Sequence, residues 1–374
     1  MKRLRFLSVG VLILFTLFPV GLAYAQTTAK PSLPQVPISY PGDTDQAIIR
    51  RAQWVEGARK EGQLVWWGTQ SPGEAVKTIA LFNKVYPFIK VEYWRGNGEA
   101  IASKLEAGYI AGQTIVDVCQ GGEPVNFPRW RKAGRMAPFV DTLPMIKTLD
   151  KRMYSKHGDW ATPGHTVGTS QYNTKLVSAA EAPKAWEDLL DPKWQGQMSM
   201  VTDVKGWVTL ALAEGGWGLE KTENFLSRLS KQNVMWGRGN SEMHAMLIAG
   251  ESKLLVAGYV YHVLRSQTKG APVAWAPVKP GIANSGPHFY IQTKANHPNA
   301  ARLFVEWLFS PQGLHLWEQT TSGMGGAFPG MGTKQSKLLE VIPLVAETED
   351  SVQQGIKLGL HQKFSKLLGI VPKK

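Results

Sequence analysis

Apolar positions between residues 64 and 119 follow two spacings that alternate along the chain. Residues 64–67, 90–94 and 115–119 are short apolar or alternating runs, which predict three strands. Residues 75–86 and 99–112 carry apolar side chains at helical spacing, which predicts a helix after each of the first two strands. This order is typical of a parallel sheet with helices on its faces. We therefore expect an α/β fold.

The loops after the first and third predicted strands are candidate ligand-binding segments. In open parallel sheets, ligands bind beyond the carboxyl ends of the strands. The first loop carries Thr69, Gln70 and Ser71, and the second carries Gly122 and Glu123. These five residues are our first candidate ligand contacts.

The rest of the chain also mixes helices with short strands. A helix is predicted from Thr44 to Gly62, because threonine is favoured as the cap at the start of a helix and glycine is favoured where a helix ends. Residues 124–165 are irregular, and the last forty residues have a basic, helical pattern. Extended segments are predicted at 166–172, 197–201, 253–261 and 271–277, and helices at 186–190, 206–215, 220–232, 243–249, 299–309 and 310–319.

The first 25 residues have the three parts of a secretory signal peptide. Lys2, Arg3 and Arg5 precede an apolar run over residues 6–22, and small residues flank the tyrosine of residues 23–25. A membrane anchor is the alternative, but the run is short and a proline and a glycine interrupt its end. We expect cleavage and export to the periplasm, followed by an extended leader over residues 26–43.

Composition narrows the class of protein. The 374 residues carry a net charge of +13, but the basic residues are scattered along the chain. Such scattered charge is either a general property of the surface or a means of attracting an anionic solute or an anionic membrane partner. It argues against a protein that binds nucleic acid. Cys119 is the single cysteine, so no disulfide forms, and its apolar neighbours predict a buried side chain rather than a nucleophile.

No catalytic motif stands out. The chain contains no paired-histidine zinc motif and no nucleophile elbow, and its eight histidines are dispersed. The glycine-rich segment 323–332 lacks the strand and helix that would make it a phosphate loop. We therefore expect a protein that is not an enzyme and holds no cofactor. A secreted hydrolase remains an alternative, although no facing nucleophile and base can be identified.

Five segments in the second half resemble a known family in order and spacing. They are Tyr172-Asn173-Thr174, residues 182–196 with their P-x-x-W-x-D-L-x-D-P-K-W-x-G pattern, residues 250–251 with 269–273, residues 297–304, and residues 307–313. Together they resemble extracellular solute-binding proteins of the ferric-iron-binding type. The resemblance spans roughly residues 60 to 330.

The resemblance implies a two-lobed periplasmic binding protein fold of type II. Such a protein delivers a small-molecule solute to the permease of an ABC importer, and we expect it to be a monomer. Two crossings between the lobes are expected, near residues 166–172 and 271–281. The expected organisation is a signal peptide at 1–25, a leader and helix at 26–60, one lobe at 61–168 with 278–333, the other at 169–277, and a helical segment at 334–374 packed on the lobes.

The resemblance also suggests where iron would bind. Iron-binding members use a histidine after the first strand, a glutamate after the third and adjacent tyrosines on a late strand. This chain has no histidine near Gln70 or Ser71, and Tyr259 and Tyr261 alternate instead of adjoining. Glu123, Tyr259 and Tyr261 would be the ligands of a ferric ion, and this incomplete set makes ferric-iron transport the alternative function.

A small anionic organic solute is the solute we favour. Loop amides and helix N-termini hold anions, and residues 202–207 form a loop entering a predicted helix. That loop supplies Lys205, Gly206 and Trp207, while Asn240 and Ser241 open a later helix. The aromatic rings of Trp207, Tyr259 and Tyr261 are candidates for stacking on the solute. Tyr172 completes the candidate set, and a solute sensor is a further alternative function.

Overall fold

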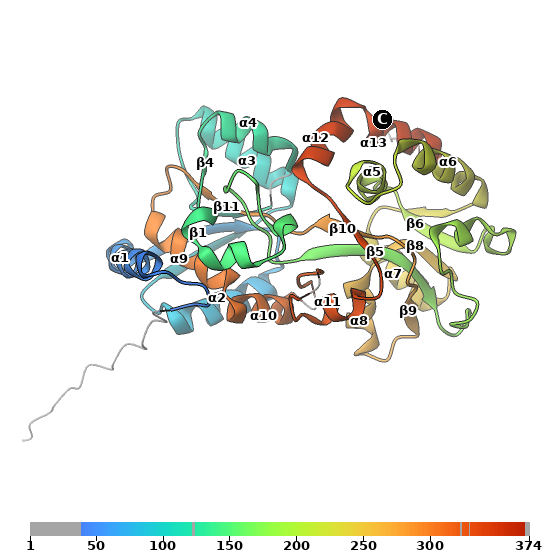
Figure 1. The fold of residues 1–374 in the computed structure, drawn as a ribbon, viewed down its shortest axis with the longest axis horizontal. Coiled ribbons are helices and arrows are strands. Elements are labelled where there is room, and N and C mark those ends of the chain that lie inside the picture. Colours follow the sequence, from blue (N-terminus) through green and yellow to red (C-terminus); the bar gives the residue numbers. More distant parts are fainter. Residues whose placement is uncertain (1–38, 122–123, 322–323, 329, 371–374) are drawn as a thin grey trace, which may run out of the picture. The chain divides into compact units, whose positions relative to one another are not determined.

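The computed structural model describes residues 39–121, 124–321, 324–328 and 330–370 (Figure 1). The predicted signal peptide lies outside these residues, as do the first part of the leader and the candidates Gly122 and Glu123. Among the described helices, none is both long enough and apolar enough to cross a membrane.

The first sheet has the strand order β2-β1-β3-β11-β4. β1 pairs in parallel with both β2 and β3, and β11 pairs antiparallel with β3 and β4. The predicted parallel sheet is therefore confirmed, although its third strand begins later than the sequence pattern suggested. Its strands are β1 Gln63–Gly68, β2 Lys90–Arg95, β3 Val118–Gln120, β4 Met136–Ala137 and β11 Phe289–Gln292.

The first of the helices that accompany this sheet begins and ends at residues that cap it. Thr44 caps α1 by accepting a hydrogen bond from the amide of Ala47, and Gly62 ends it with a left-handed φ of 64°. The helices are α1 Asp45–Glu61, α2 Pro72–Val85, α3 Gly98–Ile110, α4 Phe127–Lys132, α9 Pro298–Phe309 and α10 Pro311–Thr320. Short 3-10 turns fill the irregular stretch at Pro124–Asn126, Val140–Thr142, Pro144–Thr148 and Lys151–Met153.

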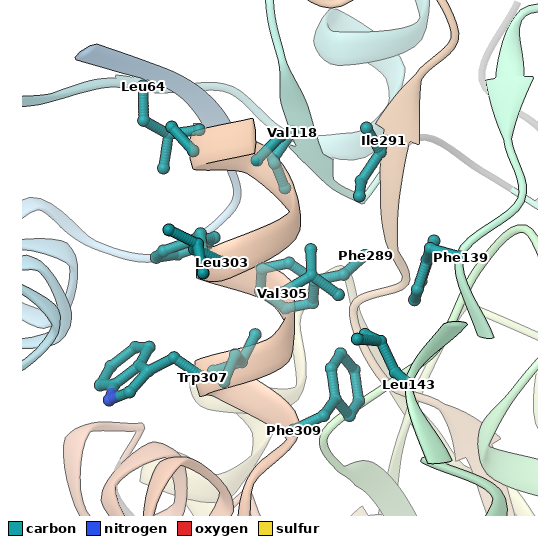
Figure 2. Packing of buried hydrophobic residues seen from close by; sticks show 14 of the residues in the cluster. Leu64, Val118, Phe139, Leu143, Phe289, Ile291, Leu303, Val305, Trp307 and Phe309 are labelled. Carbon is teal, nitrogen blue, oxygen red and sulfur yellow. The ribbon is translucent and has the colours of Figure 1, made fainter. Parts of the chain in front are cut away.

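The core of the first lobe is built around α9 (Figure 2). This helix is buried along most of its length, and Leu303 and Trp307 lie among its fully covered side chains. Figure 2 shows α9 facing apolar side chains of the sheet and of the irregular stretch, among them Phe289 and Phe139. A helix this apolar is stable only when other elements cover it on several sides.

The second sheet has the strand order β12-β10-β5-β8-β6-β7, with β9 paired to β5. It combines parallel and antiparallel pairs. Its strands are β5 His165–Asn173, β6 Met198–Val201, β7 Met235–Gly237, β8 Leu254–Tyr259, β9 Val273–Trp275, β10 Gly281–Ser285 and β12 Leu344–Ala346. Its helices are α5 Lys205–Leu212, α6 Leu219–Leu229, α7 Asn240–Ala249, α8 Val260–Gln267, α11 Lys334–Leu339, α12 Glu349–Lys357 and α13 Leu360–Leu367, with 3-10 turns at Trp186–Leu190, Pro192–Trp194 and Ser230–Gln232.

The chain passes between the two sheets at two neighbouring places. Ala161 bridges to Phe289 of the first sheet, and four residues later His165 pairs with Ser285 of the second. The return passage therefore lies between Ser285 and Phe289, later than the expected crossing at 271–281. The first passage lies just before the expected segment 166–172.

Three local expectations differ from the structure. The predicted strand 253–261 ends at Tyr259, because the chain turns into α8 at Val260, so Tyr261 is helical. The segment 334–374, expected to be helical, contains β12, which is held in place by parallel pairing with β10. β10 itself pairs within the second sheet, although residues 278–333 were expected in the first lobe. Three-residue strands such as β12 leave no usable period in the sequence.

Candidate functional site

A pocket of about 260 Å³ lies where strand ends and loops of both sheets meet. Thr69 and Gly121 follow β1 and β3 of the first sheet, and Thr166, Tyr259 and Asn284 belong to strands of the second. The remaining lining residues are Gly98, Pro124, Asp203, Lys205, Gly286, Pro287, His288, Met324 and Glu347. Segments far apart in the sequence therefore build one cavity, which both polar and apolar residues line.

A buried glutamine holds the first-sheet side of the pocket. Gln120 accepts a hydrogen bond from the amide of Thr69 at 3.1 Å and donates one to the Thr69 hydroxyl at 3.0 Å. Gly68 leaves room for this side chain, since a Cβ there would lie 2.2 Å from its Oε1. Gly121 has a φ of +114°, which favours glycine, and its amide donates to the carbonyl of His288. Thr69 is thereby fixed at the edge of the cavity.

Charged side chains come from the start of α5 and the end of β12. Asp203 accepts a hydrogen bond from the amide of Lys205 at 2.9 Å, which shapes the loop that enters α5. The amide of Glu347 donates to the carbonyl of Ala283 at 2.8 Å and so extends the pairing of β12 with β10. Two carboxylates and one ammonium group therefore line the described part of the pocket.

Asn284 adds an acceptor to this set. Its Oδ1 is buried and has no hydrogen-bond partner among the described residues. A buried polar atom without a partner carries a desolvation cost, which a bound donor would remove.

Tyr259 presents a neutral phenol to the pocket. Burial, with the nearby charge of Asp203, raises the pKa of Tyr259 far above its ordinary value. The carbonyl of Tyr259 accepts a hydrogen bond from Gln171, whose own side-chain oxygen lies 2.9 Å from His244 Nδ1. This buried network positions Tyr259 at the end of its strand.

His288 is a neutral group beside the pocket. Its ring packs edge-on against Trp160 at 4.5 Å and Phe127 at 5.3 Å. Burial lowers the pKa of His288 to about 3, so it carries no charge at neutral pH.

The structure brings three of the sequence-derived candidates together in the pocket. They are Thr69, Lys205 and Tyr259. Gly206 lies beside them, since a Cβ on it would be 3.7 Å from the Asn284 side chain. The ring of Tyr261 lies 5.9 Å from that of Tyr259 and nearly parallel to it, outside the lining of the pocket.

The other described candidates lie away from the pocket lining. Gln70 is buried and Ser71 is an exposed cap of α2, bonded to Glu74. Trp207 packs edge-on against Trp186 in the core of the second lobe, and the remaining candidates Tyr172, Asn240 and Ser241 also lie outside the lining.

Sequence reasoning missed Thr166, Asn284, His288 and Glu347. Asn284 and His288 flank the return passage between the sheets, which was expected elsewhere. Glu347 follows a strand that is recognisable only by its pairing with β10. The one available signal was the extended segment at 166–172, whose first residue lines the pocket.

The described residues contain no group of three or more histidine, cysteine, aspartate or glutamate side chains placed to hold a metal ion. Of the possible ferric ligands, Tyr259 and Tyr261 lie side by side, and burial raises the pKa of Tyr261 to about 12. A raised pKa disfavours the phenolate form that binds ferric iron.

Solved structures of periplasmic binding proteins share this fold. The iron-bound HitA from Pseudomonas aeruginosa is 18% identical, with a TM-score of 0.63 over 81% of this chain and 99% of its own. The binding protein AfuA from Actinobacillus pleuropneumoniae, solved with fructose 6-phosphate, is 17% identical, with a TM-score of 0.63 over 83% of this chain and all of its own. The expected two-lobed periplasmic binding protein fold is confirmed.

Sequence comparison extends the likeness beyond the fold. An uncharacterized protein of Haemophilus influenzae is 23% identical over 291 residues, which are 74% of this chain and 82% of that protein. Residues 77–337 match the family described as bacterial extracellular solute-binding protein. The chain therefore belongs to this family, as the resemblance of its motifs implied.

Proposed function

We propose that this protein captures a small organic anion in the pocket between its two sheets and delivers it to the permease of an ABC importer. We further propose that it works in the periplasm, after removal of residues 1–25, and that it catalyses no reaction. The observation that carries the proposal is that both a cationic side chain and acceptor side chains line the pocket. The cation is Lys205, and the acceptors are Asp203, Asn284 and Glu347.

The lining favours a solute with two kinds of group. An anionic group complements the ammonium of Lys205 and the start of α5, as the sequence suggested. The buried side-chain oxygen of Asn284, which has no partner among the described residues, calls for a hydroxyl or amine donor on the same solute. The structure of AfuA with fructose 6-phosphate, an anion that carries hydroxyls, supports this class.

Solute binding then acts through closure of the lobes. The two passages at residues 161–165 and 285–289 run side by side and form a natural hinge. A solute that contacts both lobes shifts the population toward the closed form, because its contacts with the second lobe form only there.

Ferric iron is the second candidate solute, since HitA is iron-bound and the rings of Tyr259 and Tyr261 lie together. A thermal-shift screen separates the two. Fructose 6-phosphate and other hydroxylated anions should raise the melting temperature in a dose-dependent way, because a ligand that binds only the folded state stabilises it. A shift with ferric citrate alone, accompanied by a visible charge-transfer band, would make iron the solute. No shift with any compound would reopen the sensor and hydrolase alternatives.

Neutralising Lys205 should weaken binding of the solute found in that screen. Removing one charged hydrogen-bonding partner costs roughly 1.5–3 kcal/mol, so Lys205→Met should raise the Kd about tenfold or more. Calorimetry measures the change. Lys132→Met, which removes an exposed lysine outside the pocket, should bind as the wild type does. Equal affinities for both variants would exclude Lys205 from the site.

Removing the hydroxyl of Tyr259 should weaken solute binding more than removing the hydroxyl of Tyr261. Tyr259→Phe keeps the ring of this lining residue but removes its hydroxyl, so we expect a loss of affinity of roughly fivefold with an unchanged fold. Tyr261→Phe is the matched control, because its ring stacks on Tyr259 outside the lining. Titration calorimetry and circular dichroism on both variants test this ranking. A larger effect from Tyr261→Phe would overturn it.

A further inference from the structure

The segment after β12 leads directly from the pocket into α12. Glu347 lines the pocket, and Thr348 caps the helix that begins at the next residue. The Thr348 hydroxyl accepts from the amide of Ser351 at 3.1 Å, and the Ser351 hydroxyl accepts from the amide of Thr348 at 3.0 Å. These reciprocal bonds fix the start of α12 relative to Glu347.

The body of α12 is seated on the second lobe. α12 packs against α5, and Gly355 approaches so closely that a Cβ there would lie 2.6 Å from Cγ1 of Val208. The following helix α13 buries Leu360 and Phe364 in the core of that lobe. In Figure 1 α12 and α13 are drawn at the end of the chain, beside α5 and α6.

The first turn of α12 makes charged contacts with the first lobe. Arg131 of α4 donates to both carboxylate oxygens of Glu349, at 2.8 and 3.0 Å. The indole of Trp160 donates to the same carboxylate at 3.3 Å, and Lys156 lies 2.7 Å from Asp350. α4 and Trp160 belong to the core under the first sheet.

These two ion pairs are not equally strong. The Lys156 and Asp350 side chains are mostly exposed, so solvent screens their attraction. Glu349 is only 11% exposed, and Arg131 also holds the buried Asp159. A partly buried, two-pronged pair of this kind is stronger and less sensitive to salt than an exposed one. The Arg131–Glu349 contact is therefore the main polar link that α12 makes with the first lobe.

We propose that α12 is a clasp that holds the two lobes closed through Glu349 and Arg131. Glu349 lies two residues after Glu347, so the same rigid turn carries a lining residue of the pocket and the link to the first lobe. Glu349 is a positioning residue that sets how often the pocket is closed. The effect on solute affinity rests on the proposed function, whereas the effect on lobe closure does not.

The test reads lobe separation without any solute. Spin labels are attached to cysteines replacing Ile110 in the first lobe and Lys231 in the second, both exposed positions, while the native Cys119 is buried. Glu349→Ala removes the clasp and leaves the Arg131–Asp159 pair intact. Glu223→Ala is the control, because it removes an ion pair, with Lys363, that lies within the second lobe.

We expect the ratio of short to long interlobe distances to fall about tenfold in Glu349→Ala, the factor that loss of one charged hydrogen-bonding partner produces. The Glu223→Ala control should match the parent protein. Hydrogen exchange of α12 should stay slow in both variants, which separates an open clasp from an unfolded helix. Identical distance distributions in all three proteins, or loss of α12 protection alone, would overturn the proposal. Neither result depends on the thermal-shift screen that tests solute binding.

Discussion

Replacing Arg51 with methionine is expected to lower the free energy of unfolding by about 3–5 kcal/mol, because it leaves a buried carboxylate without its partner. Arg51 is 2% exposed and Glu306, on α9, is completely buried. The guanidinium binds both oxygens of Glu306, at 2.7 and 2.8 Å, and both oxygens of Asp43, at 2.7 and 2.8 Å. The triad joins the start of the described chain to the central helix of the first lobe.

The loss should also depend on pH in a defined direction. Burial already holds the pKa of Glu306 above its ordinary value, against the opposing effect of Arg51. Without Arg51 that pKa rises further, so folding favours the protonated acid. A group whose pKa is raised on folding stabilises below its unfolded pKa and loses that contribution as pH rises. The deficit of the variant should therefore shrink as pH falls from neutral toward the ordinary pKa of glutamate.

Urea unfolding followed by circular dichroism at several pH values measures both effects. Arg59→Met is the matched control on the same helix, since Arg59 is partly exposed and lies 3.8 Å from the exposed Glu56. Such a pair is worth less than about 1 kcal/mol. If Arg51→Met costs no more than this control, the triad contributes little to stability.

Truncating Phe289 to alanine should destabilise the protein by about 3–5 kcal/mol, the usual cost of removing a large buried aromatic ring. Phe289 is completely buried on β11, with its ring 5.4 Å from that of Trp317 and 6.3 Å from that of Phe309 (Figure 2). Its neighbours belong to the sheet and to two helices, so they cannot collapse together to fill the space.

The position of Phe289 gives this substitution a second consequence. Phe289 pairs with Gln120, which holds Thr69, and it follows His288 of the pocket. We therefore expect weaker solute binding along with lower stability. Phe88→Ala, at a partly exposed ring, is the control and should cost much less. Equal midpoints of urea unfolding for the two variants would contradict the central role of the α9 core.

The helices and strands that depend on interactions between neighbouring residues could be predicted from the sequence alone. α1 was recognised from Thr44 and Gly62, because capping depends on neighbouring backbone groups. The strand–helix alternation of residues 63–120 was recognised because its elements are consecutive and long enough to show a period. Thr69 was identified because it follows a predicted strand, Lys205 because it lies in a loop that enters a predicted helix, and Tyr259 because it lies on a predicted late strand.

The remaining residues of the pocket are brought together by pairing between distant parts of the chain. Asn284 and Glu347 come together because β12 pairs with β10, more than sixty residues earlier along the chain. Trp207 was expected to stack on solute, but Trp186 and Phe225 enclose its ring in the core. An aromatic ring where a loop enters a helix can lie either in a ligand pocket or in the core. Its position depends on which distant side chains cover it. Local pattern carries no information on such partners, so the pocket's acceptors and the link between Glu349 and Arg131 appear only once the chain is folded.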